Sequence, residues 1–265
     1  MGIILLLLLS SIPPFQAAAA DVFCGNVKVV AATLVNKTSS SPTHFATVTF
    51  GDAPDVVYAL ALCRGDILDD STCADAVTNT FRKVQNLTPP EMECLKGFSA
   101  YYADCIFIYN AINLLAASPN TVGSYEDGGR PFQRWNVKNV TGDIPLITGL
   151  IHDLRVETAE KAANATPKRF ATGVLDSGTS FPKIYSLSQC TPDLSAGDCL
   201  ACLRRLLGMI NSTMALRMGG QMAVVRCYFR FDASKFYEGE PMITLGAPSP
   251  APAPAEHKSK SSTNK

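Results

Sequence analysis

Residues 190–202 read CTPDLSAGDCLAC, and residues 63–76 read CRGDILDDSTCADA. Aligned on their cysteines, the stretches differ by one inserted residue and by Ala76, which stands where the later copy has Cys202. The correspondence extends to both sides, with Tyr58 on Tyr185, the FAT of 45–47 on that of 170–172, and Cys105 on Cys227. Corresponding cysteines lie 127, 126 and 122 residues apart, the length of a whole domain rather than of a short stacking unit. The sequence therefore predicts two tandem homologous domains.

The composition is typical of globular domains and gives no electrostatic reason to expect a nucleic-acid partner. Of 265 residues, 47% are hydrophobic, which is enough for two medium-sized cores. The 23 basic and 23 acidic side chains cancel formally, and neither a basic patch nor an RNA-binding signature is visible. We therefore expect no nucleic-acid partner.

The first 20 residues have the features of a secretory signal peptide. A short apolar run, 3–9, is followed by a Ser/Pro break and by four alanines before Asp21, although no Lys or Arg precedes the run. That run is far shorter than the roughly 20 apolar residues of a membrane span, and no later segment is long enough. We expect a secreted, extracellular protein without a membrane anchor, whose nine cysteines form a disulfide framework.

Domain boundaries follow from the repeat and from local composition. We assign residues 1–20 to the signal peptide, 21–125 to the first domain and 130–240 to the second, with a linker at 118–130. Residues 246–265 alternate Ala with Pro and end polar, which predicts an extended tail without a lipid-anchor signal. Five Asn-x-Ser/Thr sequons are candidate N-glycosylation sites: Asn36, Asn86, Asn139, Asn164 and Asn211. A proline follows the sequons of Asn86 and Asn164, where we expect lower occupancy.

Local patterns predict mixed helices and strands. In the first domain we expect a Ser/Thr-rich loop at 37–43, strands at 45–50 and 56–62, and a helix from near Cys73 capped by Asp69 or Asp70. Residues 97–110 are apolar enough for one or two strands buried on both faces. In the second domain we expect helices over 144–165 and after Ser195, and a strand at 221–231.

Comparing the two domains assigns the cysteine pairs. Cys24 and Cys94 both lack counterparts in the second domain, as a bonded pair would. If Cys202 pairs with Cys227, the loss at Ala76 leaves Cys105 as a free thiol and explains the odd total. The remaining pairs are Cys63–Cys73 and Cys190–Cys199. The alternative is a redox-active CxxC at Cys199 and Cys202, since a helix N-terminus lowers a thiol pKa, but framework spacing and secretion favour structural disulfides.

Signatures of enzymatic chemistry are missing from the sequence. It contains no phosphate-binding loop, no GxSxG elbow and no metal-binding helix. His44, His152 and His257 lie at no zinc-ligand spacing, and we interpret His152 as a helix-surface residue. We therefore expect no enzymatic activity, no metal and no cofactor.

The Cys-x8-Cys-x2-Cys pattern, preceded by FATG and a tyrosine and followed by a cysteine in an aromatic strand, resembles the plant cysteine-rich repeat secretory proteins. Their unit is the ginkbilobin-homologous, or stress-antifungal, domain. The resemblance implies an α+β class in which each domain has two α-helices on an antiparallel sheet of about five strands. It also implies an extracellular, apoplastic protein of defence or stress response.

The resemblance further implies a mannose-type site made of an Asn, an Arg and a Glu at fixed offsets from the cysteines. In the first domain these positions are Gly25, Ser99 and Asn110, which carry neither charge. In the second domain the Arg and Glu positions are Gln221 and Asp232. Gln221 and Asp232 are therefore the predicted ligand-binding residues, for weak sugar binding.

Two functions from different classes follow. The leading hypothesis is a non-enzymatic module that binds carbohydrate or a fungal surface. The alternative is an interaction or signalling protein that contacts receptor ectodomains or cell-wall components.

We predict four intramolecular disulfides and one free thiol at Cys105, because a cysteine among apolar and aromatic neighbours behaves as a buried, inert side chain. Mass mapping of the secreted, non-reduced protein tests this prediction. A disulfide between Cys105 and any other cysteine would contradict the pairing.

Overall fold

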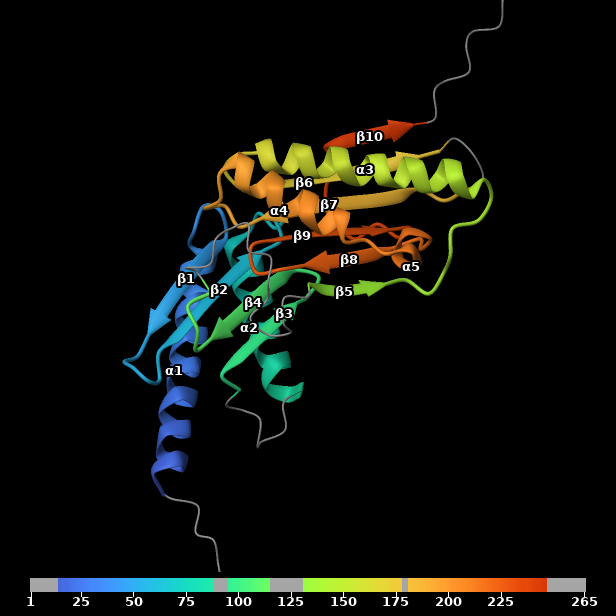
Figure 1. Ribbon diagram of the computed structural model, residues 1–265. Helices are drawn as coiled ribbons and strands as arrows, with labels where there is room; N and C mark the ends of the chain where they lie inside the picture. The colour runs from blue at the N-terminus through green and yellow to red at the C-terminus, as the bar shows by residue number, and fades with distance from the viewer. Residues whose placement is uncertain (1–13, 88–94, 115–130, 178–180, 247–265) are drawn as a thin grey trace, which may run out of the picture.

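The computed structural model describes residues 14–87, 95–114, 131–177 and 181–246 (Figure 1). The first domain contains α1 (Pro14–Ser39), β1 (Phe45–Phe50), β2 (Val57–Cys63), α2 (Asp70–Leu87), β3 (Gly97–Tyr101) and β4 (Cys105–Asn110). The second contains β5 (Phe132–Trp135), α3 (Ile144–Asn164), β6 (Phe170–Asp176), β7 (Ile184–Cys190), α4 (Ala196–Gly208), α5 (Ser212–Ala215), β8 (Gly220–Ala223), β9 (Cys227–Asp232) and β10 (Ile243–Gly246). The linker at 118–130 and most of the tail at 246–265 lie outside the described residues.

The two sheets repeat the same strand pairing. The first has the order β1-β2-β4-β3, and the second contains the matching series β6-β7-β9-β8 with β10 and β5 added at its edges. Tyr58 pairs with Asn110 in the first sheet as Tyr185 pairs with Asp232 in the second. Cys63 likewise pairs with Cys105, and Cys190 with Cys227. The duplication read from the sequence is therefore preserved down to the register of single residue pairs.

The repeat also preserves an unusual turn before the first long strand. His44 and Arg169 precede β1 and β6 and have positive φ angles of 50° and 48°. The His44 carbonyl accepts the Cys63 N–H, and the Arg169 carbonyl accepts the Cys190 N–H, both at 2.9 Å. His44 Nδ1 lies 3.1 Å from the Ile67 carbonyl, and Arg169 Nε donates to the Leu194 carbonyl at 3.2 Å. Two different side chains thus hold equivalent loops.

The α+β class with two tandem domains that carry their own disulfides is confirmed, and sheets of four and six strands agree with about five each. One strand departs from the predicted antiparallel sheets, since β10 runs parallel to β6. Because β10 spans Ile243–Gly246, the second sheet continues past the boundary predicted at residue 240. A four-residue strand after a Gly- and Glu-containing segment carries too little periodicity to be recognised in the sequence.

The first helix, α1, was not predicted. It continues to Ser39, so the loop expected at 37–43 begins three residues later than predicted. Its described buried residues follow a helical stripe that begins at Phe23 and includes Val27, Val30, Ala31 and Leu34. Val22 and Val29 are nevertheless exposed, so the helix is apolar on both faces, and its first residues, 14–20, belong to the segment predicted as a signal peptide. This distribution hides the helical period from sequence inspection.

The helix caps agree more closely with the sequence. The Ser195 hydroxyl accepts the Asp198 N–H at 3.1 Å and begins α4 at Ala196. Asp69 accepts the Thr72 N–H at 2.7 Å, so α2 begins at Asp70, three residues before the position expected near Cys73. The segment predicted as one strand at 221–231 consists of two strands, β8 and β9.

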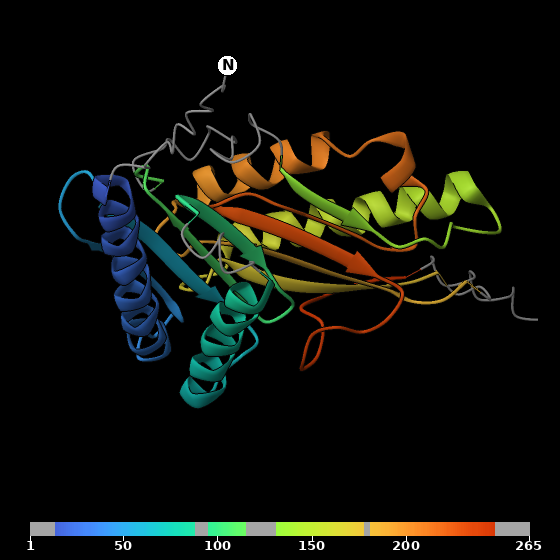
Figure 2. The same cartoon turned by 90° about the horizontal axis from the view of Figure 1, so that it is seen from below.

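Four layers build the molecule, with the two sheets face to face inside and the helices outside (Figures 1 and 2). One face of each sheet packs on its own helices. The opposite faces share a third core, whose buried residues are Leu60, Leu62, Ile106, Ile108, Leu114, Leu187, Ala223, Tyr228 and Tyr237. Every residue of β4 is therefore buried, as the sequence predicted for part of 97–110.

Hydrogen bonds from the Gln189 side chain join the two domains beside this third core. Gln189 is fully buried; its Oε1 accepts the Gly65 N–H at 3.2 Å and the Tyr228 hydroxyl at 2.8 Å, and its Nε2 donates to the Cys63 carbonyl at 3.3 Å. A Cβ on Gly65 would collide with the ring of Phe170. The domains therefore meet through main-chain atoms at a distance that only glycine permits.

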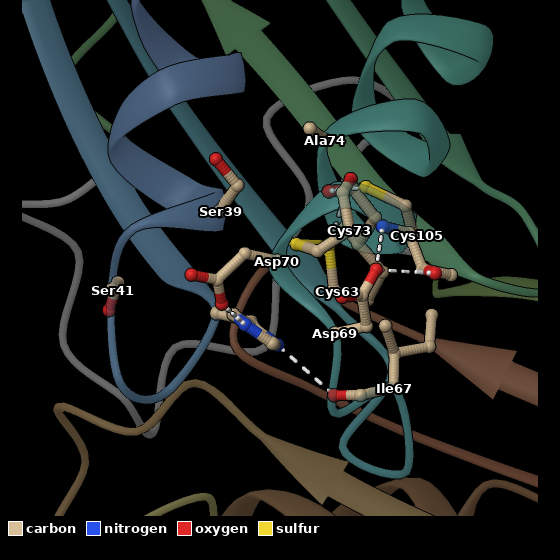
Figure 3. Close-up of a disulfide and its surroundings, with 12 residues drawn as sticks. Ser39, Ser41, Cys63, Ile67, Asp69, Asp70, Cys73, Ala74 and Cys105 are labelled. Carbon is tan, nitrogen blue, oxygen red and sulfur yellow. Dashed lines mark hydrogen bonds and ion pairs between the residues drawn. A yellow bond between two sulfur atoms is a disulfide. The ribbon is translucent and has the colours of Figure 1, made fainter.

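Three disulfides lie within the described residues and join Cys63 to Cys73, Cys190 to Cys199 and Cys202 to Cys227. Cys24 is also disulfide-bonded, and its predicted partner, Cys94, lies outside the described residues. Since Cys199 and Cys202 bond to different partners, they do not form a redox pair. Figure 3 shows the Cys63–Cys73 disulfide between β2 and α2, with Cys105 beside it.

Cys105 is a free thiol that is 2% exposed. Burial raises its pKa to about 12, so the thiol stays protonated at neutral pH and is a poor nucleophile. Its side chain interacts with the Thr80 hydroxyl, one helical turn after Ala76 on α2. Ala76 and Cys105 also belong to the same apolar cluster, which agrees with the alignment of Ala76 with Cys202.

The first prediction from the fold concerns Ala76→Cys, which should restore the missing disulfide with Cys105. Closing a loop of about 30 residues would raise the free energy of unfolding by up to roughly 3 kcal/mol. Thiol titration after oxidative folding should find no free thiol, against one in the wild type. Ala76→Ser is the matched control, and two free thiols in Ala76→Cys would contradict the alignment of the domains.

The second prediction concerns Gln189→Leu, which leaves the Gly65 N–H, the Cys63 carbonyl and the Tyr228 hydroxyl unpaired in the buried interface. We expect the free energy of unfolding to fall by about 3 kcal/mol or more, because three buried groups lose their partner and each costs about 1 to 3 kcal/mol. Urea denaturation measures the change. Gln133→Leu makes the same chemical change on the exposed strand β5 and should stay near the wild type; equal loss in both variants would exclude a specific role for Gln189.

Candidate functional site

A pocket of about 260 Å³ opens at one end of strands β5, β8 and β9. It is lined by Arg134, Trp135, Asn136, Gly219, Gly220, Gln221, Arg230, Phe231 and Asp232. Both predicted ligand-binding residues, Gln221 and Asp232, are among them. The pocket therefore collects the sequence-predicted residues of the second domain in one place.

Strand register explains how these side chains meet. Arg134 on β5 pairs with Gln221 on β8, and Gln221 pairs with Arg230 on β9. Residues paired across neighbouring strands point to the same face of a sheet, so the three side chains form one polar row. Asp232 lies two residues after Arg230 and therefore on the same face. This row continues the sheet face that packs on the first domain at Ala223 and Tyr228.

Hydrogen bonds fix the row. Arg134 Nε donates to Gln221 Oε1 at 2.9 Å, and Gln221 is only 4% exposed. Arg230 Nη2 donates to Asp232 Oδ2 at 3.3 Å, and the Ser234 N–H donates to Asp232 Oδ1 at 3.2 Å. The side-chain oxygens of Gln221 and Asp232, which were predicted to bind a sugar, thus already accept hydrogen bonds from protein donors.

Arg230 is the most strongly held cation of the pocket. Its guanidinium carbon lies 4.0 Å from the centroid of the Phe236 ring, a favourable cation–π arrangement. Burial lowers the pKa of Arg230, the ion pair with Asp232 opposes that shift, and the nearby positive charge of Arg134 adds to it. The guanidinium is therefore partly desolvated while it remains charged at neutral pH.

The backbone at Gly219 gives room for the carboxylate. A Cβ at Gly219 would lie 3.1 Å from Asp232 Cγ and equally close to the Phe231 carbonyl oxygen. Glycine therefore lets β8 approach the end of β9 where the pocket forms.

The sequence analysis missed Arg134, Arg230 and Asn136. Arg134 comes from an edge strand formed next to the linker, and only the pairing of β5 with β8 brings it beside Gln221. The position inferred to have lost its arginine, Gln221, is thus bonded to an arginine from a neighbouring strand. Strand pairing over a long sequence separation leaves no signal in a single sequence.

The corresponding first-domain residues lie in different surroundings. Gly25 is on α1, Ser99 on β3 and Asn110 at the end of β4. Asn110 is buried, and its Oδ1 accepts the Ile112 N–H at 2.8 Å. Ile108, which has the strand position of Arg230, is buried in the core between the domains. A hydrophobic contact therefore replaces the charge in the first domain.

The remaining predicted sites are placed as follows. Asn36, Asn139, Asn164 and Asn211 are exposed, and the side chain of Asn86 lies outside the described residues. Asn211 caps α5 through Oδ1, which leaves its Nδ2 for a glycan. His152 is exposed on α3. Among the described residues, no group of three or more His, Cys, Asp or Glu side chains is arranged to hold a metal ion.

The fold places the chain in the class of tandem α+β domains, each of which carries its own disulfides. The family model described as salt stress response/antifungal matches residues 14–111 and again residues 121–234, so the chain belongs to that family.

Relatives include a rice cysteine-rich receptor-like protein kinase 10, 35% identical over 84% of this chain and 33% of its own length. An Arabidopsis cysteine-rich receptor-like protein kinase 6 is 30% identical over 84% of this chain and 31% of its own length. The chain thus spans about a third of each of these two relatives. None of the helices in the described ranges combines the length and apolarity needed to cross a bilayer.

Two solved structures share the fold. The tandem DUF26 ectodomain of the Arabidopsis cysteine-rich receptor-like protein PDLP8 has a TM-score of 0.59 at 19% identity, covering 80% of this chain and 90% of that one. The corresponding PDLP5 ectodomain has a TM-score of 0.58 at 18% identity, covering 80% and 92%. At these identities the likeness concerns the fold alone.

Proposed function

We propose that this protein is a secreted, non-enzymatic binding module of defence or stress response, and that its second domain binds carbohydrate in the β5–β8–β9 pocket. One observation carries the proposal: Gln221 and Asp232, assigned separately from sequence offsets, line one pocket with Arg134, Arg230 and Asn136. Amides, guanidinium groups and carboxylates are suited to fixing vicinal sugar hydroxyls. The family description, which names stress response and antifungal action, agrees with this role.

The alternative is an extracellular interaction or signalling protein that contacts receptor ectodomains or cell-wall components. Its support is the fold shared with ectodomains of receptor-like proteins over most of their length. Direct glycan binding and pull-down from a cell-wall extract distinguish the two functions.

Mannose binding is predicted to be weak and confined to the second domain. A mannose hydroxyl must compete with Arg134 for Gln221 and with Arg230 for Asp232. Asp232→Ala and Gln221→Ala should each reduce the remaining affinity, with a loss of about 1.5 to 3 kcal/mol for a bond to a charged group. Calorimetry of the secreted, deglycosylated protein with mannose and mannan measures it.

Ser99→Ala is the control for Gln221→Ala, because Ser99 has the corresponding position in the first domain. It should leave the affinity unchanged. Tight mannose binding that persists in Asp232→Ala would place the sugar site elsewhere and overturn the transfer of these residues.

A further inference from the structure

The β5–β8–β9 pocket has more hydrogen-bond donors than acceptors. Each guanidinium carries five N–H donors. Arg134 uses Nε on Gln221, and Arg230 uses Nη2 on Asp232; their other N–H groups have no protein acceptor within the described residues. Asn136 Oδ1 accepts the Lys138 N–H, which leaves the donor side of that amide for a ligand. A complementary ligand must bring acceptors.

The charges around the pocket are also unbalanced. Two arginines face one carboxylate, Asp232, whose Oδ2 is 3.3 Å from Arg230 Nη2. A third arginine, Arg155 on α3, lies behind the sheet with its guanidinium carbon 4.9 Å from the centroid of the Phe231 ring.

Arg155 is 4% exposed, and its Nε and Nη1 have no hydrogen-bond partner within the described residues. Burial lowers its pKa to about 10, so it remains a cation at neutral pH. In the low dielectric of the core its charge is poorly screened and adds to the positive potential at this end of β9.

We propose that the pocket recognises carboxylate-bearing sugars, that is uronic acids, in preference to neutral hexoses. This inference rests on the carbohydrate-binding function proposed above. A carboxylate supplies further acceptors and a second negative charge to balance the two arginines, and guanidinium groups bind it in a two-point, charge-assisted geometry. A neutral hydroxyl would leave the exposed Arg134 bonded, among the described residues, only to the uncharged Gln221 amide, and Arg230 with only its 3.3 Å contact to Asp232.

Pocket size agrees with one sugar unit. About 260 Å³ lies just below the roughly 300 to 1,000 Å³ of pockets for drug-sized ligands. Because the pocket lies at a sheet edge with β5 exposed, the rest of an oligosaccharide can extend into solvent. The ligand class is therefore a uronic acid unit within a chain.

Calorimetry with a galacturonic acid trimer, its fully methyl-esterified form and mannotriose tests the proposal on the whole secreted protein. The acid is expected to bind at least tenfold more tightly than the ester or mannotriose, since a charge-assisted bond is worth about that factor. Its affinity should fall as sodium chloride is raised, because salt screens exposed charges.

Two variants give effects of opposite sign. Arg134→Gln, on an exposed edge strand, should weaken binding of the acid about tenfold. Asp232→Asn removes the carboxylate that competes for Arg230, so it should strengthen binding of the acid while it weakens binding of mannotriose. Arg204→Gln removes an exposed arginine on α4 that pairs with Glu160 and should change neither.

The outcomes separate this inference from the function on which it rests. Equal binding of the acid and its ester, or weaker binding of the acid in Asp232→Asn, overturns the preference for uronic acids and leaves carbohydrate binding intact. Absence of binding to all three saccharides overturns both proposals. A triglutamate peptide that binds as tightly as the acid trimer overturns the assignment to sugars.

Discussion

The face-to-face packing of the two sheets is the constraint on which the rest of the structure depends. It buries the inner face of β2 and β4 while the outer face of the same strands packs on α1 and α2. Such packing requires main-chain atoms of the domains to approach closely, which Gly65 permits and Gln189 satisfies. The inner-face residues Leu60, Leu62, Ile106 and Ile108 of these two strands are therefore buried against the second domain.

Cysteine spacing and strand pattern predicted much of this fold. Residues 190–202 and 63–76 identified the duplication, and the loss at Ala76 explained the free, buried Cys105. These features are local or repeat at fixed intervals, so a single sequence displays them. Helix α1 and strand β10 were missed because one is apolar on both faces and the other has four residues.

The candidate site was predicted only in part, for a different physical reason. Gln221 and Asp232 belong to the repeated segment, whereas Arg134 reaches the pocket through an edge strand that has no counterpart among the described strands of the first sheet. The interaction between Arg134 and Gln221 joins residues 87 positions apart. A contact between residues so far apart in the sequence forms only because β5 pairs with β8. The residue types of a single sequence do not reveal that pairing.

The two copies show how one strand position acquired two roles. Ile108 on β4 lies in the core between the domains, and Arg230 on β9 lies in the pocket, although both have the same register against their neighbours. Burying a guanidinium in the shared core without a partner would cost several kcal/mol, about as much as burying any unpaired charge. The inner face therefore divides where the first domain ends: apolar residues such as Ala223 fill the covered part, and Arg134, Gln221 and Arg230 fill the open part. The pocket is a consequence of this incomplete coverage, since the same row of side chains under a longer first sheet would have to be hydrophobic.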